Sequence, residues 1–478
     1  MQGVSLLVTM MLARLVAPEA YGTIALSVIF INISNVLVDG GLGGALVQKK
    51  DATEADFNTV FYLSLSLSVA LYVGMFFAAP WIADFYQTAE LKNLLRFLAL
   101  SLIFNALNSV QGAELVRKML FHLSFRISLC CSLSSAIVGI TLAFLGYGPW
   151  ALAWSTISGA IVGVWARWYF IAWRPRLTFS WHSYTGLFRY GWKLAVASLL
   201  ASAYSDLHGL LIGKFYNRES LAFVTKGSSV PRLAMDAING SLGRVAFPAL
   251  AQVQDQREKV RDTMRRMIAS STFLVFPLMV GCAVCADELV FLLLGPNWYE
   301  AIPFTRIACF TFALWPFHTI NLQAINALGR SDIFLILEII KKSIGLIVLI
   351  VAIPLGVWWM MALGAFIAGP LSVIVNSWPN RKLLNYTIGM QLRDVLPALA
   401  LCGVMAGVIL PIAWLPLPGW GKLLLQVPFG ALTYFFAAWL FRLAPLCEMA
   451  RMVGPTFRTR APNPLQPIVK SILNRLDS

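Results

Sequence analysis

A repeated segment constrains what this chain can fold into more than any other feature. Residues 13–47 read ARLVAPEAYGTIALSVIFINISNVLVDGGLGGALV, and residues 213–247 read GKFYNRESLAFVTKGSSVPRLAMDAINGSLGRVAF. The two copies align without a gap, so that Arg14 matches Lys214 and Glu19 matches Glu219. Each copy indicates a helix end, a short polar loop, an apolar helix and a glycine-rich end. A repeat of this length predicts two structurally similar halves.

The repeat continues beyond this segment with small changes of length. Gly148-Pro149-Trp150 aligns with Gly356-Val357-Trp358, Leu107-Asn108 with Ile320-Asn321, and Arg117 with Arg330. The first apolar run, residues 4–15, is shorter than the roughly 20 residues that span a bilayer. Its counterpart starts near Phe188. We therefore expect the missing half of this first helix upstream of Met1, because of a truncated chain or a late start.

Composition places both halves in a membrane. Apolar residues make up 59% of the 478 residues and charged residues only 12%, whereas soluble domains average about half and about a quarter. Apolar runs of about 20 residues recur along most of the chain, as membrane-spanning helices require. The net charge of +15 lies in short segments between these runs. Because the positive-inside rule explains that pattern, we expect membrane lipids and no nucleic acid as partners.

The apolar runs predict an all-α polytopic membrane protein of about fourteen transmembrane helices. The predicted spans are residues 4–15, 21–38, 57–79, 91–112, 124–145, 150–171, 188–212, 220–238, 268–294, 304–328, 333–353, 357–378, 395–413 and 423–441. We expect a six-helix lobe over 1–172, a cytoplasmic linker over 173–187, a second six-helix lobe over 188–380, helices 13 and 14 over 381–443, and a basic cytoplasmic tail over 444–478. Since six is even, both lobes enter from the same side, related by a pseudo-two-fold axis along the membrane normal with a cleft between them.

Lysine and arginine set the predicted orientation. They occupy one set of alternate loops together with the tail after Ala444, whereas the opposite loops 146–149, 294–301, 354–356 and 415–421 contain none. The basic loops hold Lys49, Lys50, Arg117, Lys118, Arg126, Arg174, Arg176, Arg257, Lys259, Arg261, Arg265, Arg266, Arg330, Arg381 and Lys382. Basic loops stay in the cytoplasm. The C-terminus is therefore predicted to be cytoplasmic.

The sequence contains no pattern for a catalytic site. The phosphate-binding loop, HExxH and GxSxG patterns are absent, and the four histidines are scattered. Cys282 and Cys285 form a C-x-x-C pair, but no second pair or histidine lies near it in the sequence. We therefore expect no catalytic residue, no metal and no cofactor. Any work must be driven by an ion gradient, the membrane potential or a substrate gradient.

Charged residues inside apolar helices are the candidates for function, since each costs a few kcal/mol unless it faces water or a partner. The candidate substrate-binding cations are Arg14, Lys193, Lys226, Arg232 and Arg244. The candidates for ion coupling or pairing are Asp39, Asp206, Asp236 and Glu338. The alternative for Arg14, Lys214 and Arg244 is that they reach the nearer interface. The alternative for Lys341 and Lys342 is that they mark a cytoplasmic helix end.

The second copy of the repeat carries most of these charges in a weakly apolar helix, KGSSVPRLAMDAINGSLGR. Pro231 predicts a kink, and the spacing of Arg232 and Asp236 places both on one face, where they can pair. Such a helix is poorly suited to lipid and favours a wet, net-positive cleft. A phosphate-linked sugar would fit that cleft, because arginine and lysine pair well with phosphate oxygens.

Several segments resemble polysaccharide exporters: ARLVAPEAYG and DGGLGGALVQKKD within residues 13–51, FPLMVG at 276–281, LLLGPNW at 292–298, and INALGRSD at 325–332. The similarity is greatest to lipopolysaccharide and exopolysaccharide exporters of the colanic-acid type. These belong to the multidrug/oligosaccharidyl-lipid/polysaccharide exporter superfamily. The resemblance covers essentially the whole chain.

The resemblance implies an O-unit flippase of the bacterial inner membrane. Such a protein moves an undecaprenyl-diphosphate-linked oligosaccharide to the outer leaflet by alternating access. It implies a polysaccharide polymerase and chain-length or export machinery as partners. Arginines in a cationic cavity are required in related flippases, so Arg14, Arg232 and Arg244 are candidates by location and charge. Two alternatives remain: a drug or small-cation antiporter, which a cationic cleft disfavours, and a polymerase or ligase, which needs a long external loop.

Overall fold

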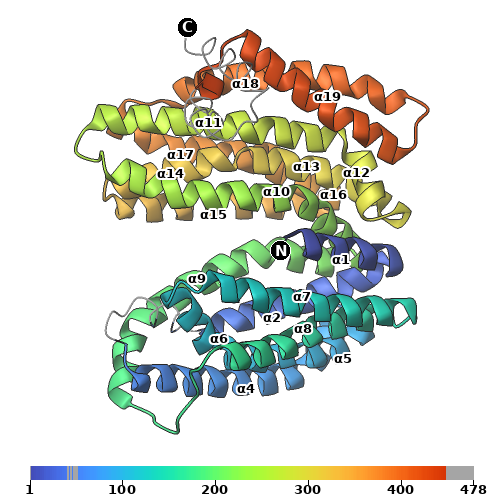
Figure 1. Cartoon of the computed structure of the whole chain (residues 1–478), viewed down its shortest axis with the longest axis vertical. Coiled ribbons are helices and arrows are strands. Elements are labelled where there is room, and N and C mark those ends of the chain that lie inside the picture. The colour runs from blue at the N-terminus through green and yellow to red at the C-terminus, as the bar shows by residue number, and fades with distance from the viewer. Residues whose placement is uncertain (1, 40–41, 43–45, 47–51, 448–478) are drawn as a thin grey trace, which may run out of the picture. The chain divides into compact units, whose positions relative to one another are not determined.

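A computed structural model describes residues 2–39, 42, 46 and 52–447, and within that part of the chain the regular elements are helices, with no strand (Figure 1). Each predicted span corresponds to one helix or to two or three consecutive helical pieces. By length and composition, nine helical segments within the described residues could cross a membrane. The chain is therefore a multi-pass helical membrane protein.

Contacts divide the chain into two units, residues 1–225 and 226–478. The first contains α1 (Gln2–Leu15), α2 (Pro18–Asp39), α4 (Glu54–Phe85), α5 (Ala89–Leu98), α6 (Leu100–Arg117), α7 (Phe121–Phe144), α8 (Pro149–Phe170), α9 (Trp181–Phe215) and the start of α10 (Arg218–Ala251). The boundary lies inside α10, and the lobe and linker bounds drawn from the repeat stay a prediction.

The second unit continues α10 and adds the remaining elements. They are α11 (Arg257–Val284), α12 (Ala286–Leu293), η1 (Pro296–Ala301), α13 (Ile302–Ala313), α14 (Trp315–Ala327), α15 (Ser331–Ala352), η2 (Ile353–Leu355), α16 (Val357–Leu363), the π-helical η3 (Gly364–Ala368), α17 (Gly369–Leu384), α18 (Ile388–Ile409), η4 (Leu410–Trp414) and α19 (Gly419–Leu440). The predicted spans 91–112, 268–294, 304–328 and 357–378 are each broken into shorter helices.

The register of the repeat is confirmed by the helix ends. Helices α1 and α9 end at Leu15 and Phe215, and α2 and α10 begin at Pro18 and Arg218. The same 200-residue offset therefore holds at both boundaries. Helix α1 has 14 residues and α9 has 35.

One detail of the predicted alignment is wrong. Met119 and Gly329 both have positive φ, at 52° and 73°, and both close a helix end. In each case the next amide bonds back across the turn, Leu120 to the Leu115 carbonyl and Arg330 to the Ile325 carbonyl, as in a Schellman motif. Leu120 is thus the structural counterpart of Arg330, and the predicted match with Arg117 is displaced by three residues, because the left-handed turn and not the arginine marks the equivalent position.

Helix starts follow local capping rules. Thr53 caps α4 through a capping box, since the Thr53 amide donates to Asp56 Oδ2 at 2.8 Å and the Asp56 amide donates to Thr53 Oγ1 at 3.4 Å. Ser180 caps α9, its Oγ accepting from the Ser183 amide at 3.2 Å. Because of this cap, α9 begins at Trp181, inside the predicted linker 173–187.

Small residues hold helices together in the first unit. A Cβ atom on Gly139 would lie 2.8 Å from Ser155 Cβ, and one on Gly159 would lie 2.3 Å from Ser135 Oγ. Ser155 Oγ donates to the Ser135 carbonyl at 2.8 Å. Helices α7 and α8, which carry these residues, run side by side (Figure 1). Close approach through small residues is typical of helix pairs in lipid, where apolar contact alone gives little selectivity.

A buried amide network joins the repeat to the helices outside it in the second unit. Asn321 of α14 and Gln391 of α18 exchange two hydrogen bonds of 3.0 Å, and Asn380 of α17 donates to Asn321 Oδ1 at 2.8 Å. All three side chains are fully buried. Beside them, Tyr434 of α19 donates to the Phe273 carbonyl of α11 at 2.9 Å. Buried amides hydrogen-bonded to one another specify one arrangement of helices, so the network fixes α18 against α14 and α17, and the Tyr434 bond fixes α19 against α11.

Candidate functional site

Helix α10 positions the charges of the second repeat copy along a continuous helix. Gly227 lets this helix approach the start of α13, since a Cβ there would lie 2.7 Å from the Ala301 carbonyl oxygen and 3.2 Å from Phe304 Cβ. Lys226 beside it is half-buried, whereas Arg232 and Asp236 are exposed. The backbone contact therefore sets where these side chains project.

The predicted Arg232–Asp236 pair is absent. Within the described residues no ion pair joins them, and the Arg232 guanidinium carbon lies 5.9 Å from the centre of the Phe312 ring instead. An ion pair between two exposed side chains gains little over hydration, whereas a guanidinium over an aromatic face keeps both its water and its attraction to the ring. Arg232 is therefore available to a ligand rather than neutralised by its neighbour.

The remaining candidates lie on several elements. Arg14 and Asp39 are exposed at the ends of α1 and α2. Asp206 of α9 is half-buried and accepts from Ser202 Oγ at 3.4 Å. Glu338 of α15 pairs locally with Lys341, with 2.5 Å between Oε1 and Nζ, as the i,i+3 spacing allows. Arg14, Asp39 and Asp206 belong to the first unit, and Glu338 belongs to the second.

Two candidates fall partly outside what the structure describes. Lys193 belongs to α9 and Arg244 to α10, but their side chains are outside the described part of the chain. Their roles stay predictions.

Lys214, the repeat partner of Arg14, behaves as an interfacial residue. Its Nζ donates to the Phe85 carbonyl at 2.6 Å and lies 3.8 Å from the centre of the Phe85 ring. Phe85 is the last residue of α4. Lys214, in the last turn of α9, thus donates to a carbonyl at the C-terminal end of α4. The helix dipole favours a positive charge at that end. This geometry fits the alternative that Lys214 reaches the interface.

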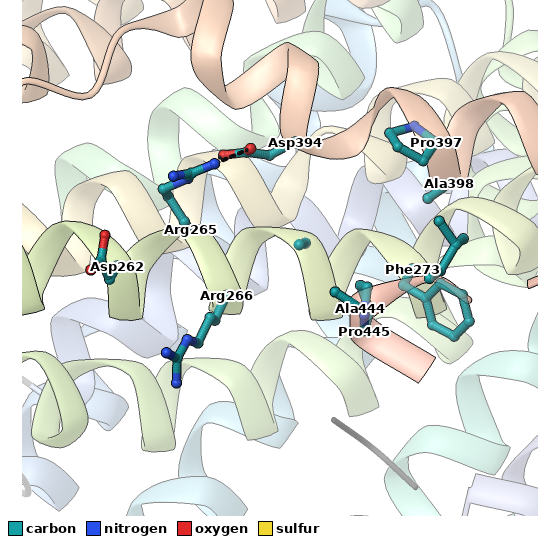
Figure 2. Close-up of a pocket in the computed structure, with 11 residues that line it drawn as sticks. Asp262, Arg265, Arg266, Phe273, Asp394, Pro397, Ala398, Ala444 and Pro445 are labelled. Atoms are coloured by element: carbon teal, nitrogen blue, oxygen red, sulfur yellow. Dashed lines mark hydrogen bonds and ion pairs between the residues drawn. The ribbon is translucent and has the colours of Figure 1, made fainter. Parts of the chain in front are cut away.

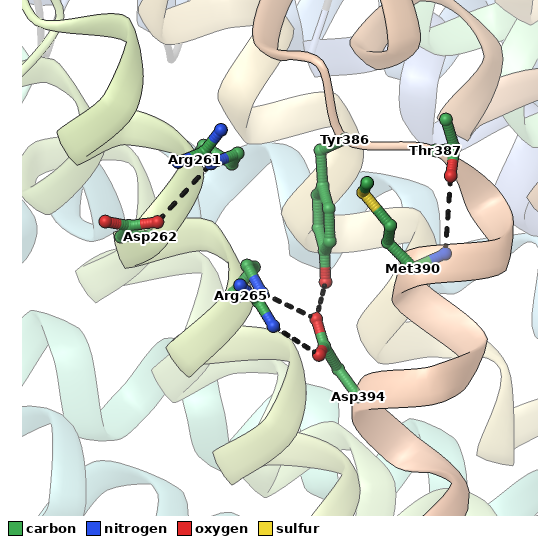
Figure 3. Close-up of polar contacts among 7 residues, drawn as sticks. All are labelled: Arg261, Asp262, Arg265, Tyr386, Thr387, Met390 and Asp394. Atoms are coloured by element: carbon green, nitrogen blue, oxygen red, sulfur yellow. Dashed lines mark hydrogen bonds and ion pairs between the residues drawn. The ribbon is translucent and has the colours of Figure 1, made fainter.

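An ionic cluster between α11 and α18 was missed by sequence reasoning. Arg265 makes a bidentate pair with Asp394, with nitrogen–oxygen distances of 2.8 and 2.7 Å, and Tyr386 Oη donates to Asp394 Oδ2 at 2.8 Å (Figure 3). The sequence places Arg265 in a loop, but it lies two turns inside α11. Burial and the bond to Asp394 raise the pKa of the Tyr386 hydroxyl, which therefore stays protonated and donating. One feature of the sequence could have indicated this cluster: Asp394 is a charged residue directly before the predicted span 395–413.

A pocket of about 480 Å³ adjoins this cluster. One end is polar, with Asp262, Arg266 and the Arg265–Asp394 pair, and the other is apolar, with Phe273 and Pro397 (Figure 2). Arg265 and Arg266 project from opposite sides of α11 in this view. Among the described residues that line the pocket, none is a serine, cysteine or histidine.

Metal chemistry finds no support in the part of the chain that the structure describes. No group of three or more histidine, cysteine or acidic side chains is placed to hold a metal ion among those residues. Cys282 and Cys285 are free thiols on either side of the α11 end.

Comparison with known proteins identifies the family. Residues 11–303 match the model of a family described as polysaccharide biosynthesis protein. The chain belongs to this family. The match covers more than half of the chain and confirms the resemblance to polysaccharide exporters. The chain is 24% identical over 416 residues to the teichuronic acid biosynthesis protein TuaB of Bacillus subtilis, covering 84% of this chain and 85% of that protein.

Other similarities agree on the class of protein. The chain is 24% identical over 313 residues to the lipopolysaccharide biosynthesis protein WzxC of Escherichia coli, covering 64% and 63% of the two chains. Its fold is similar to the lipid II flippase MurJ in an inward closed conformation (TM-score 0.72, 16% identity, 92% and 96% covered) and to an inward-facing MATE multidrug transporter (0.62, 16%, 80% and 95%). The chain is therefore a multi-pass helical membrane protein of the polysaccharide biosynthesis family, and its fold is similar to that of a lipid flippase and a multidrug transporter.

Proposed function

We propose that the protein is a flippase for undecaprenyl-diphosphate-linked oligosaccharide repeat units in lipopolysaccharide or exopolysaccharide synthesis. Family membership over residues 11–303 carries this proposal. The relatives named for teichuronic acid and lipopolysaccharide synthesis support a glycan cargo, and the fold shared with a lipid flippase supports a lipid-linked form. The two six-helix lobes predicted from the repeat would alternate access.

Substrate recognition is assigned to basic side chains of the membrane helices. Arg232 is exposed beside the Phe312 ring and has no acidic partner within the described residues, which suits it to pair with phosphate oxygens. Arg14, Lys193, Lys226 and Arg244 are proposed to share this role. Asp39, Asp206, Asp236 and Glu338 are proposed for ion coupling or pairing.

The proposed setting is the bacterial inner membrane with a cytoplasmic C-terminus. The basic first turns of α11, which hold Arg257, Lys259 and Arg261, support this orientation. Helix α11 has 28 residues. At about 1.5 Å per residue it is longer than a bilayer core of about 30 Å, so its basic end can extend beyond the lipid. A polysaccharide polymerase and chain-length or export machinery would act on the delivered product.

Disruption of the gene tests the proposal. Surface polysaccharide should be lost, and lipid-linked repeat units should accumulate facing the cytoplasm, measured by leaflet-selective labelling of the lipid-linked glycan. Complementation with the wild-type gene should restore both. If repeat units still reach the outer leaflet and polysaccharide is normal in the disrupted strain, the flippase proposal fails.

The role of α10 is tested by Arg232→Ala and Arg244→Ala in the complemented strain. At least one should lower export about tenfold or more, because a charge-assisted hydrogen bond contributes roughly 1.5–3 kcal/mol. Arg306→Ala is the matched control, since Arg306 is equally charged but bonds Asp287 at 2.7 Å. Wild-type export in both α10 variants, with normal protein levels, would leave these arginines a role in topology only.

A further inference from the structure

A polar cavity lies wholly inside the first unit. It has a volume of about 360 Å³ and is lined by α2, α5, α6 and α8, which contribute polar side chains together with apolar ones such as Val28, Ile31 and Leu98. Asn32 and Asn35 come from α2, and Asn105 and Asn108 come from α6. A volume near the lower end of the roughly 300–1,000 Å³ of small-molecule sites suits one sugar ring.

The polar groups form a graded path from mouth to floor. Asn32 and Asn105 are exposed, whereas Asn108 is only 8% exposed. Asn105 donates to Asn35 Oδ1 at 3.1 Å, so the amides near the mouth hold one another. At the floor, Asn108 Oδ1 has no hydrogen-bond partner within the described residues. A buried amide oxygen left without a partner costs about 1–3 kcal/mol, which indicates a site built for an additional group.

Arg167 supplies the charge of the cavity. Its Nη1 makes one long contact of 3.5 Å with the Gly163 carbonyl, and its Nε is buried without a partner in the described chain. Gly163 leaves room for it, because a Cβ there would lie 3.2 Å from Arg167 Nη1. Among the described residues that line the cavity, Arg167 is the one charged side chain, and no carboxylate accompanies it. The cavity therefore matches a single negative charge on an otherwise polar, neutral body.

We propose that this cavity binds an acidic sugar residue, a hexuronate, of the transported oligosaccharide. The planar guanidinium of Arg167 binds the carboxylate in a bidentate manner. The asparagine amides both donate and accept, as sugar hydroxyls do. A diphosphate carries more than one negative charge and is poorly matched by one arginine. The inference rests on the proposed function, and it adds that the cargo contains a uronic acid.

Binding to the purified full-length protein tests this inference without transport. Saturation-transfer difference NMR is titrated with sodium glucuronate, and glucose, acetate and inorganic phosphate are compared at equal concentration. We expect glucuronate to bind, glucose and acetate to bind at least tenfold more weakly, and phosphate to displace it poorly. Equal binding of glucose, or displacement by acetate or phosphate as effective as by glucuronate itself, would overturn the hexuronate assignment.

Two variants locate the site. Arg167→Gln should weaken glucuronate binding about tenfold or more, and Asn108→Leu should weaken it severalfold. Arg174→Gln is the control, because this arginine bonds the Ile171 and Trp173 carbonyls outside the cavity and should change binding less than twofold. If Arg167→Gln fails to fold, Asn108→Leu and Arg167→Lys carry the test. Unchanged affinity in the folded cavity variants contradicts the inference.

The two proposals can fail separately. Glucuronate binding together with normal export in the disrupted strain would leave the cavity assignment standing and remove the flippase. Loss of export in that strain without glucuronate binding would keep the flippase and remove the hexuronate site.

Discussion

Asp394 illustrates how one side chain joins segments that are far apart in sequence. It accepts two hydrogen bonds from Arg265 and one from Tyr386. Its side chain is 14% exposed and that of Arg265 is 49% exposed, so the two partners have unequal desolvation. The carboxylate loses more solvation than the guanidinium and therefore depends more on the pair.

This asymmetry predicts unequal effects of substitution. Asp394→Ala should lower the free energy of unfolding by about 1–3 kcal/mol, because it leaves the fully buried Tyr386 hydroxyl without an acceptor. Arg265→Ala should cost more, about 2–4 kcal/mol, because it leaves the mostly buried Asp394 carboxylate without its counter-charge. Thermal unfolding in detergent measures both, with Asp262→Ala as the control. A larger loss for Asp394→Ala would contradict this account.

Single residues were predictable from the sequence only in part. The charges of α10 stood out because they interrupt an apolar run. Arg167 did not, because a basic residue in the last turn of a predicted span indicates a helix end. The partner of Arg265 lies 129 residues away, and spacing within one helix carries no information about such contacts.

At the scale of elements, glycines decide which helices can cross. A Cβ on Gly22 of α2 would lie 1.9 Å from the Arg218 carbonyl oxygen at the start of α10. This neighbour is backbone and cannot rotate away. Gly74 of α4, in contrast, is exposed, and a Cβ atom added there would have no neighbouring atom within 4 Å.

Gly22→Ala should therefore destabilise the protein although alanine favours helix. Separation of α2 from α10 should cost about 1–3 kcal/mol or more, as overpacking does. Gly74→Ala should be neutral or stabilising by up to about 1 kcal/mol, from helix propensity alone. The comparison is made by thermal unfolding of the two purified variants. Equal stability would show that the α2–α10 contact is not close in solution.

Helix existence was predictable but helix breaks were not. Length and hydropathy identify a span, and every predicted span falls on helical segments. Nine helical segments of the described residues are long and apolar enough to cross a membrane. The breaks depend on local chemistry and packing. Pro316 near the start of α14 and the π-helical turn Gly364–Ala368 before α17 interrupt runs that look uniformly apolar. A hydropathy pattern does not register such interruptions, because proline and glycine barely change its average.

At the scale of the whole molecule, the repeat predicted two related halves, and helix ends confirm its register. The contact boundary nevertheless falls at Thr225 rather than before α9. The reason is the close packing of α9 on α2. A Cβ atom on Gly209 of α9 would lie 2.6 Å from the Ile29 side chain of α2, and a Cβ atom on Gly213 would lie 2.4 Å from the Leu26 side chain. Glycine at these positions lets α9 lie directly on α2, which repeat matching alone does not predict.

Reporter fusions test the predicted orientation of the whole chain. Green fluorescent protein joined after Arg442 should fluoresce, because the positive-inside rule places that end in the cytoplasm. Alkaline phosphatase joined at Leu417, in the turn between α18 and α19, should be active on the opposite side. The exchanged reporters at the same two positions serve as controls. Phosphatase activity after Arg442 would reverse the orientation.

The matched turns at Met119 and Gly329 give the chain an internal guide for engineering. Methionine at a φ of 52° carries a left-handed strain of about 1–2 kcal/mol that glycine avoids. Met119→Gly should therefore raise the melting temperature, whereas Gly329→Met should lower it. A residue found at a position in one half is compatible with the backbone at the equivalent position in the other half. Substitutions copied between equivalent positions are therefore expected to be tolerated more often than random ones.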